Sequence, residues 1–234
     1  MSVLLNLAQI ATFYGQSQAL FGVDLSIQEG QVVALMGRNG MGKTTTIRSI
    51  CGMSRASSGS LHFLGVDIST LPSHQIARLG IGLVPEGRRC FSNLTVTENL
   101  LVAARARAEH NNHWDLAKVE ALFPRLAERR SQYANSLSGG EQQMLAVGRA
   151  LMTNPKLLIL DEATEGLAPV IRQEIWQAVK QLKAAGQSIL IVDKTIKELL
   201  PVADHCVILE RGSTVFSGLP EAMSKTILQQ YLGV

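Results

Sequence analysis

A glycine-rich segment near residue 40 is the clearest indication of phosphate chemistry in the sequence. Its residues, Gly37-Arg-Asn-Gly-Met-Gly-Lys43-Thr44, fit the pattern G-x-x-x-x-G-K-[ST]. Glycines let the backbone curl so that its N–H groups point at phosphate oxygens, and the helix that follows adds its positive N-terminal end. Lys43 can bridge the β- and γ-phosphates while the Thr44 hydroxyl contacts Mg²⁺. We call this segment the phosphate loop and expect it to bind ATP; a glycine-rich turn without a ligand is the disfavoured alternative.

Two adjacent acids form a second candidate for chemistry. Asp161 and Glu162 follow the apolar run 156–160, which we expect to be a buried strand. A carboxylate at the end of such a strand lies at the carboxyl edge of the sheet, beside the phosphate loop. Asp161 is suited to hold Mg²⁺, and Glu162 can polarise an attacking water as a general base. Ordinary surface acids are the alternative, and the phosphate loop upstream argues against it.

A third segment, Leu137-Ser-Gly-Gly-Glu-Gln-Gln143, has the spacing of a helix start. Ser138 and Glu141 stand three residues apart, as in a capping box. The two glycines between them leave the helix start bare of side chains. The γ-phosphate of a second nucleotide could therefore approach these N–H groups and the Ser138 hydroxyl. Taken alone, the segment is equally typical of a plain capped helix.

The elements that must position these residues alternate between strands and helices. Apolar runs without polar alternation, separated by helices, indicate an α/β fold with a mainly parallel sheet covered on both faces. Between Thr97 and about Leu137 the patterns are helical, with a capping box at Thr95 and Glu98 and a break at Pro124. We expect one domain over residues 1–234, with a helical subdomain at about 95–153 inserted into the sheet core. The expected strands are 23–27, 31–36, 60–64, 81–84, 156–160, 188–192 and 205–210; the expected helices are 44–51, 74–79, 138–154 and 169–186.

Composition narrows the class of protein further. Hydrophobic residues make up 46% of the 234 residues and charged residues 18%, which is typical of a folded globular domain. No apolar run approaches the roughly 18 residues that span a bilayer, and we expect neither a transmembrane segment nor a signal peptide. The net charge of +3 is mild and its charges are mixed, so nucleic acid is not an expected partner. The widely spaced Cys51, Cys90 and Cys206 indicate buried, reduced thiols rather than a zinc site.

Taken together, these segments resemble the ABC ATPase family over essentially the whole chain. Gly37–Thr44 looks like its Walker A motif, Leu157–Glu162 like its Walker B motif, and Leu137–Gln143 like its signature segment. The resemblance implies a P-loop NTPase fold with an N-terminal antiparallel β part. It also implies a head-to-tail dimer that binds two ATP molecules, each between one chain's phosphate loop and the other's signature. The 165–168 stretch then lies at the family's D-loop.

The resemblance assigns roles to individual residues. For ATP contact it indicates Tyr14, as the aromatic that stacks on adenine, with Gly37, Arg38, Asn39, Gly40, Met41, Gly42, Lys43, Thr44 and Thr45. For the partner's ATP it indicates Ser138, Gly139, Gly140, Glu141 and Gln143. For the metal it indicates Thr44, Glu86 and Asp161, and for catalysis Glu162 and Lys194. A partly buried tyrosine without a ligand is the alternative for Tyr14.

Several stretches narrow the resemblance to one branch of the family. They are 84–89, Phe91, 94–96, 98–100 and 161–169, and they look like the second, F-type, ATPase of branched-chain (hydrophobic) amino-acid importers. Such importers pair two ATPases with two integral-membrane permeases and an external substrate-binding protein, and their ATPases lie at the cytoplasmic face of the membrane. ATPases of urea and short-amide importers are closely similar, so that reading stays open. Substrate and direction are not written in this chain, nor is the choice between homodimer and heterodimer.

Two positions depart from the wider family. Glu86 stands where a glutamine normally touches Mg²⁺ and the attacking water; glutamate is familiar there in the branched-chain branch. After 189–192, Asp193 and Lys194 stand where an acid and the switch histidine are usual. Lysine can contact a γ-phosphate but cannot relay a proton as neutral imidazole does. We therefore expect slower hydrolysis at this site than at one with histidine; a solvated lysine just past a strand is the alternative.

Three classes of function fit an ABC ATPase. The first is a transporter motor, for which Arg88, Arg89 and Phe91 are candidates to grip a permease helix, although they are equally typical of an ordinary surface. The second is a soluble ATPase acting on ribosomes or DNA, which usually has two modules or long inserted arms. The third is a catalytically dead regulatory subunit, which the presence of Lys43 and Glu162 argues against. The sequence favours the first.

Overall fold

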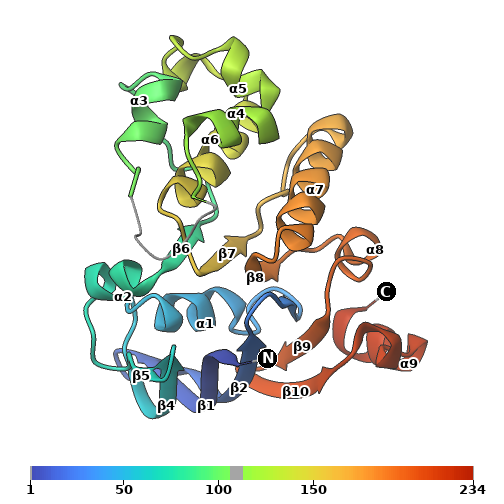
Figure 1. Cartoon of the computed structure of the whole chain (residues 1–234). Helices are drawn as coiled ribbons and strands as arrows, with labels where there is room; N and C mark the ends of the chain where they lie inside the picture. Colours follow the sequence, from blue (N-terminus) through green and yellow to red (C-terminus); the bar gives the residue numbers. More distant parts are fainter. Residues whose placement is uncertain (1, 106–112, 234) are drawn as a thin grey trace.

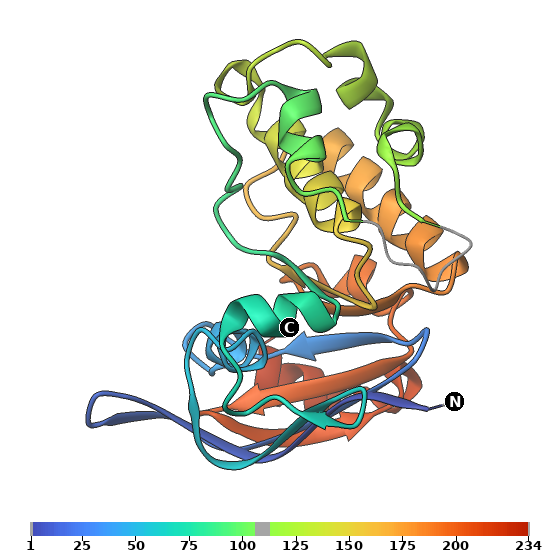
Figure 2. The ribbon, with the colours of Figure 1, turned by 60° about the vertical axis from the view of Figure 1, so that its left-hand side comes forward.

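A ten-stranded sheet forms the lower part of the molecule in Figure 1. The computed structural model describes residues 2–105 and 113–233, and in these the strand order is β5-β4-β1-β2-β10-β9-β3-β8-β7-β6. The second view shows the hairpin of β1 and β2 projecting to one side of this sheet, below the helices (Figure 2). One half of the sheet is parallel and the other is mostly antiparallel.

The parallel half is the part that carries the candidate site. It consists of β6 (Ile81–Val84), β7 (Leu157–Asp161), β8 (Ser188–Val192), β3 (Val32–Met36) and β9 (His205–Glu210). Strands β3, β7 and β8 are buried along their whole length, as expected for parallel strands covered on both faces. The predicted α/β class with a mainly parallel core is confirmed.

The antiparallel half contains longer strands than the sequence indicated. It consists of β1 (Val3–Tyr14), β2 (Ser17–Gln28), β4 (Ala56–Phe63), β5 (Val66–Asp67) and β10 (Ser213–Gly218). In this half we expected strands only at 23–27 and 60–64, and we assigned no strand to 3–14. The pairing of β1 with β2 shifts register near Gln9, whose φ of 52° marks a bulge. Such a bulge interrupts the alternation by which a strand is recognised in sequence.

Helices cover both faces of the sheet. They are α1 (Lys43–Ile50), α2 (Ser73–Leu79), α7 (Pro169–Ala184), α8 (Ile196–Leu199) and α9 (Lys225–Ile227), with short turns at 220–222 and 228–232. Alternate residues of β3 enter different cores: Val33 and Leu35 pack with Ile47 of α1, whereas Val32 and Ala34 pack with Trp176 of α7. Both cores therefore meet at the strand that leads into the phosphate loop.

The described residues between β6 and β7 contain helices and no strand. These helices are α3 (Val96–Leu101), α4 (Leu116–Leu122), α5 (Pro124–Glu128) and α6 (Gly139–Met152), with a 3₁₀ turn at 134–136 (Figure 1). The predicted capping boxes are present at Thr95–Glu98 and Ser138–Glu141, and Pro124 opens α5. Because α6 shares one core cluster with the sheet, we propose that the lobe at 95–153 is a subdomain of one domain.

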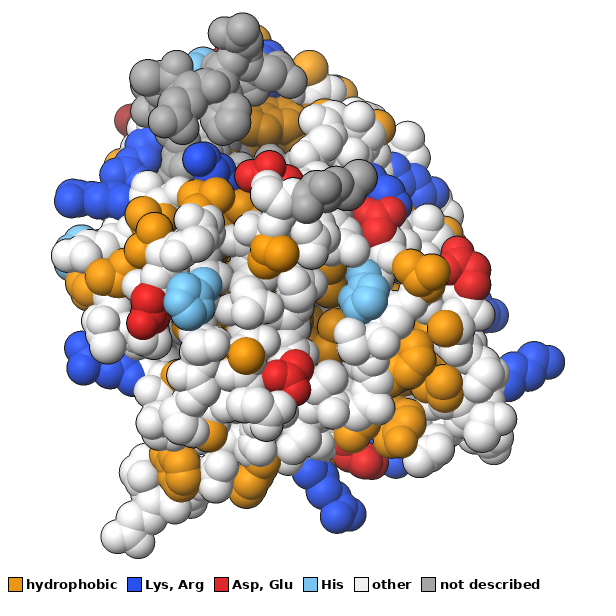
Figure 3. Space-filling model, turned by 60° about the horizontal axis from the view of Figure 1, so that its bottom comes forward, with side chains coloured by type: hydrophobic (Ala, Val, Ile, Leu, Met, Phe, Trp, Pro, Cys, Tyr) orange, Lys and Arg blue, Asp and Glu red, His pale blue; other side chains and the backbone are white. Residues whose placement is uncertain are grey.

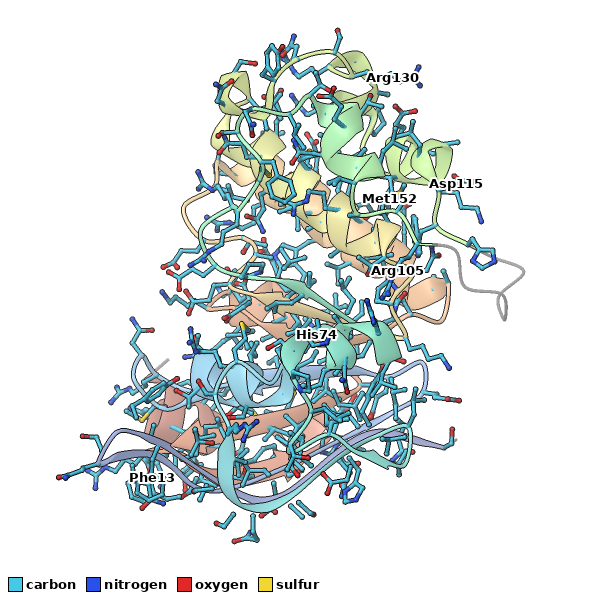
Figure 4. The ribbon with its side chains drawn as sticks, turned by 90° about the vertical axis from the view of Figure 1, so that its left-hand side faces the viewer. Phe13, His74, Arg105, Asp115, Arg130 and Met152 are labelled. Atoms are coloured by element: carbon cyan, nitrogen blue, oxygen red, sulfur yellow. The ribbon has the colours of Figure 1, made fainter. Side chains whose placement is uncertain are left out.

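Local contacts hold this helical lobe together, as the side view shows (Figure 4). The Asp115 carboxylate accepts from the Lys118 N–H at 2.8 Å and caps α4. Arg130 pairs with the buried Glu120. The Arg105 N–H donates to the Met152 carbonyl at 3.0 Å and ties the segment after α3 to the end of α6. These contacts therefore fix the position of α6 within the lobe.

The three cysteines are free thiols. Cys51 and Cys206 are buried as expected, whereas Cys90 is only half-buried. Burial raises the pKa of the Cys51 thiol to about 12 and that of Cys206 to about 11, so both stay protonated at neutral pH.

Candidate functional site

The phosphate loop connects β3 to α1 through two glycines that no other residue can replace without strain. Gly37 has a φ of 145°, and a Cβ there would lie 2.5 Å from the Leu209 carbonyl oxygen. Gly42 has a φ of 102°, and its Cβ would lie 2.7 Å from Leu20. The loop backbone is therefore pressed against β9 and β2, and this fixes its curl.

Lys43 opens α1, and its side chain turns back into the loop. Its Nζ donates to the Gly37 carbonyl at 2.7 Å and to the Arg38 carbonyl at 3.0 Å, and the residue is buried. Burial lowers its pKa, an effect that the nearby Glu162 and Asp161 oppose. The ammonium thus lies inside the loop, where phosphate oxygens are expected to bind.

Asp161 and Glu162 end β7 beside this lysine. Burial is the main cause that raises the pKa of Asp161, with the Glu86 charge adding to it, while the Thr44 hydroxyl and Lys43 lower it. Glu162 has a φ of 50°, and its N–H donates to the Val192 carbonyl at 2.9 Å. The left-handed turn directs the chain away from the sheet immediately after the buried carboxylate.

The oxygens around Asp161 suit a hard divalent cation. Asp161 Oδ1 is buried and has no hydrogen-bond partner among the described residues. The Thr44 hydroxyl contacts the same carboxylate, and Glu86 lies close enough to influence it electrostatically. Hydroxyl and carboxylate oxygens are the ligands that Mg²⁺ prefers. The donor set therefore fits the predicted metal.

Lys194 lies just past β8, opposite the turn that follows β7. Its Nζ is 3.1 Å from Glu162 Oε2 and 2.5 Å from Glu165 Oε1. Carboxylate oxygens of Glu86, Glu162 and Glu165 lie within 4.8 Å of one another. The structure therefore places Lys194, whose side chain is 48% exposed, beside a cluster of carboxylates.

A cavity of about 490 Å³ joins these groups to the phosphate loop. Its lining includes five residues that the sequence did not assign to the ATP pocket, namely Gln18, Ala19, Phe21, Glu165 and Arg211. The sequence places Glu165 in the D-loop and assigns it no contact with ATP, although an acid at this position could have indicated a role in the site. Phe21 is a strongly exposed aromatic on β2, and only the pairing of strands brings it and Arg211 to the cavity. Predicted residues in the lining are Asn39, Gly40, Gly42, Lys43, Thr44, Thr45, Glu86, Glu162 and Lys194.

Other predicted residues lie beside this cavity. Tyr14 ends β1, is 46% exposed, and its hydroxyl is 3.4 Å from the Ser54 hydroxyl. Met41 accepts from the Arg211 N–H through its sulfur at 3.2 Å and from the Gly212 N–H through its carbonyl. Arg38 contacts Gly233 near the end of the chain. Tyr14 is thus a half-exposed aromatic at the end of β1.

The signature segment opens α6 in the helical lobe. Glu141 Oε2 accepts from the Ser138 N–H at 2.8 Å, and the same carboxylate pairs with Arg129. Its pKa is lowered by the hydrogen bonds from Ser138 and by Arg129, against the effect of burial. Gln143 is buried inside the lobe. The Glu141 carboxylate therefore serves the helix cap, and the Ser138 hydroxyl and glycine N–H groups remain at the helix start.

The two signature glycines are each covered closely. A Cβ on Gly140 would lie 2.5 Å from Ile171 of α7, and one on Gly139 would collide with the Arg88 guanidinium. Arg88 also donates from Nη2 to the carbonyls of Glu165 and Gly166, at 3.4 and 3.3 Å. None of Ser138, Gly139, Gly140, Glu141 and Gln143 lines the phosphate-loop cavity of the same chain.

Comparison with known proteins adds a family model and full-length relatives. The model described as "ABC transporter" matches residues 20–165. The chain is 42% identical to the high-affinity branched-chain amino acid transport ATP-binding protein BraG of Pseudomonas aeruginosa, over 98% of this chain and 100% of that one. It is 32% identical to the lipopolysaccharide export system ATP-binding protein LptB of Haemophilus influenzae, over 98% and 97% of the two chains.

A solved structure agrees with the fold. The chain superposes on the ADP conformation of an ATP-binding cassette of an ABC transporter with a TM-score of 0.83 and 27% identity, covering 98% of this chain and 96% of that one. The match therefore extends over the sheet and the helical lobe together.

Proposed function

The chain belongs to the ABC transporter family of ATP-binding proteins, and we propose that it hydrolyses ATP to drive a membrane importer of branched-chain amino acids. As a member of this family it is an ATP-binding transport ATPase. The observation that carries the hydrolytic role is the placement of Asp161 and Glu162 beside Lys43 at the end of β7. The amino-acid substrate is proposed from the 42% identity to BraG.

In the proposed mechanism the phosphate loop binds the triphosphate. Lys43 exchanges its bonds to the Gly37 and Arg38 carbonyls for phosphate oxygens, and the N–H groups of α1 face the same anion. Thr45 and the exposed Tyr14 ring lie on the side where the nucleoside is proposed to bind. The nucleotide thereby spans from β1 to the end of β7.

Glu162 is proposed as the general base. Its pKa is raised, chiefly by burial, so its carboxylate is a better proton acceptor than a solvent-exposed glutamate. Lys194, whose ammonium already lies at Glu162, is proposed to contact the γ-phosphate. Thr44, Asp161 and Glu86 would hold Mg²⁺, which when bound neutralises charge on the β- and γ-phosphates.

A second ATPase subunit is proposed to complete the site. The signature N–H groups and the Ser138 hydroxyl are at a helix start that does not line this chain's own cavity, with the Arg88 guanidinium beside Gly139. They are available to the nucleotide of a partner chain, either a second copy or a sister ATPase. Each nucleotide would then lie between one phosphate loop and one signature segment.

A groove between the sheet and the helical lobe is proposed to dock a permease. It has a volume of about 400 Å³, and its apolar lining includes Ile76, Leu83 and Ala146, with Arg89 and Arg149 at its edge. Phe91 is exposed nearby, and the Arg149 guanidinium stacks 4.4 Å from its ring centre. Aromatic and arginine side chains around an apolar groove are typical of an interface for a helix. No described helix is both long and apolar enough to cross a membrane.

One face of the molecule mixes charged side chains of both signs with hydrophobic ones (Figure 3). On the face shown in Figure 3, the coloured lysine and arginine side chains lie mostly toward the margin, with acidic and hydrophobic side chains between them. The described part of that face therefore carries no continuous basic patch of the kind that binds a phosphate backbone.

The experiment that tests this function is capture of the tagged chain from detergent-solubilised native membranes, with partners identified by mass spectrometry. We expect two integral-membrane permeases, a second ATPase or a second copy, and a substrate-binding protein encoded with them that binds branched-chain amino acids. A binding protein specific for urea or short amides would replace the substrate assignment and keep the transport role. Recovery with an exporter would overturn import, and recovery only with ribosomal or DNA-repair proteins would overturn transport.

A further inference from the structure

One ammonium group is shared by two carboxylates at the candidate site. Lys194 Nζ contacts Glu162 Oε2 at 3.1 Å and Glu165 Oε1 at 2.5 Å. The two acids differ in exposure, because the Glu162 side chain is 12% exposed and that of Glu165 is 45% exposed. The lysine is therefore bonded to both acids, and its shorter contact is to the more exposed Glu165.

The backbone fixes the two sides of this contact independently of the ion pair. The Glu165 N–H donates to the Glu162 carbonyl at 3.2 Å, and Gly166, with a φ of 65°, turns the chain next. The Thr164 hydroxyl donates to the buried Asp193, whose other oxygen accepts from the Thr195 N–H at 2.8 Å. The Thr164–Asp193 hydrogen bond thus joins the turn after β7 to the turn after β8. Glu165 and Lys194 each follow one of the two bonded residues.

The charges agree with this geometry. Hydrogen bonds from Glu162 and then from Lys194 lower the pKa of Glu165, whereas burial raises that of Glu162. The pKa of Lys194 is raised first by its bond to Glu165 and next by its bond to Glu162. These pKa directions agree with the shorter contact of Lys194 to Glu165.

Resting on the function proposed above, we propose that Glu165 is a positioning residue that competes with Glu162 for the Lys194 ammonium and so weakens the Glu162–Lys194 ion pair. Without Glu165, the ammonium pairs with Glu162 alone, and that ion pair becomes tighter. The ammonium would then occupy the Glu162 oxygen that must accept a proton from water. Glu165 acts on hydrolysis only through the lysine.

A double-mutant cycle on the purified chain tests this inference. The kcat and KM for ATP are measured for the unchanged chain, Glu165→Ala, Lys194→Ala and the double variant. We expect Glu165→Ala to lower kcat about tenfold with KM changed less than about twofold, because the loss concerns the hydrolytic step. Adding Lys194→Ala should restore kcat to the level of Lys194→Ala alone, since no ammonium remains to occupy Glu162.

Rescue separates positioning from a structural role. If Glu165→Ala costs the same factor with and without Lys194, or costs nothing, the inference is overturned. Glu29→Ala is the matched control, because Glu29 is an exposed acid outside the cavity, and its kcat should not change. Glu165→Gln should fall between the unchanged chain and Glu165→Ala, since an amide oxygen still accepts from the lysine. If the unchanged chain hydrolyses ATP and Glu162→Gln abolishes this hydrolysis, the proposed function stands whatever the double-mutant cycle shows.

Discussion

The phosphate loop and the signature segment are both glycine-rich helix starts, yet they differ in how they use charge. At the phosphate loop, Lys43 and Lys194 face a cluster of carboxylates across one cavity. At the signature, the Glu141 carboxylate is taken up by the helix cap and by Arg129, which leaves N–H groups and a hydroxyl. We propose that the first arrangement carries out the chemistry and holds the metal, and that the second only recognises an anion.

Glu162→Gln should have the largest effect on the hydrolysis step at the phosphate loop. The amide cannot accept a proton, so we expect kcat to fall by about 100-fold or more while ATP binding is retained. Turnover and nucleotide affinity of the purified chain measure this, with Glu29→Gln as the control at an exposed position outside the cavity. Unchanged turnover would remove Glu162 from its proposed role.

Asp161→Asn should weaken the binding of Mg²⁺ while leaving the proposed general base, Glu162, unchanged. An amide has lost the charge that attracts a cation, so the Mg²⁺ concentration for half-maximal hydrolysis should rise about tenfold. Titration of activity with Mg²⁺ after treatment with EDTA checks this. Equal Mg²⁺ requirements in both chains would show that the buried Asp161 carboxylate does not hold the ion.

Ser138→Ala and Thr95→Ala compare two equivalent helix caps. Each removes the hydroxyl of a capping box, so each should cost about 1 kcal/mol of stability and lower Tm by about 2–4 °C. Only Ser138 is proposed to face a partner's nucleotide, and its loss should lower kcat roughly tenfold, the value of a hydrogen bond to a charged group. A similar fall in kcat for both variants would mean that the effect is one of stability.

Lys194→His should have the smallest effect on kcat, and it should raise kcat instead of lowering it. A neutral imidazole can pass on a proton, so we expect kcat to rise about threefold at pH 8. The gain should disappear as the pH falls through about 6.5, where the imidazole becomes protonated. The same rate as the unchanged chain in Lys194→His and in Lys194→Ala would contradict the role given to this position.

The sequence predicted the elements that follow local rules. The strands at 81–84, 188–192 and 205–210 and both capping boxes are confirmed, because they depend on apolar runs and on residues three positions apart. The whole of β1 was missed, because the bulge at Gln9 depends on pairing with β2 and β4.

The candidate site was predictable in its backbone and less so in its side chains. Lys43, Asp161 and Glu162 come together because a loop follows one parallel strand and the acids end another. The contact of Lys194 with Glu165 and the position of Arg88 over Gly139 join residues 29 and 51 positions apart. These depend on how two turns are tied together by Thr164 and Asp193, which no spacing rule contains.

Lys43 has a further consequence for the kinetics of ATP capture. Its ammonium bonds to the Gly37 and Arg38 carbonyls and holds the loop in its curled form from within. A nucleotide therefore meets a loop that needs no folding, and the entropy of ordering it has been lost already when the chain folds. Association should accordingly be limited by encounter, and differences in affinity among variants of the loop should appear in the dissociation rate.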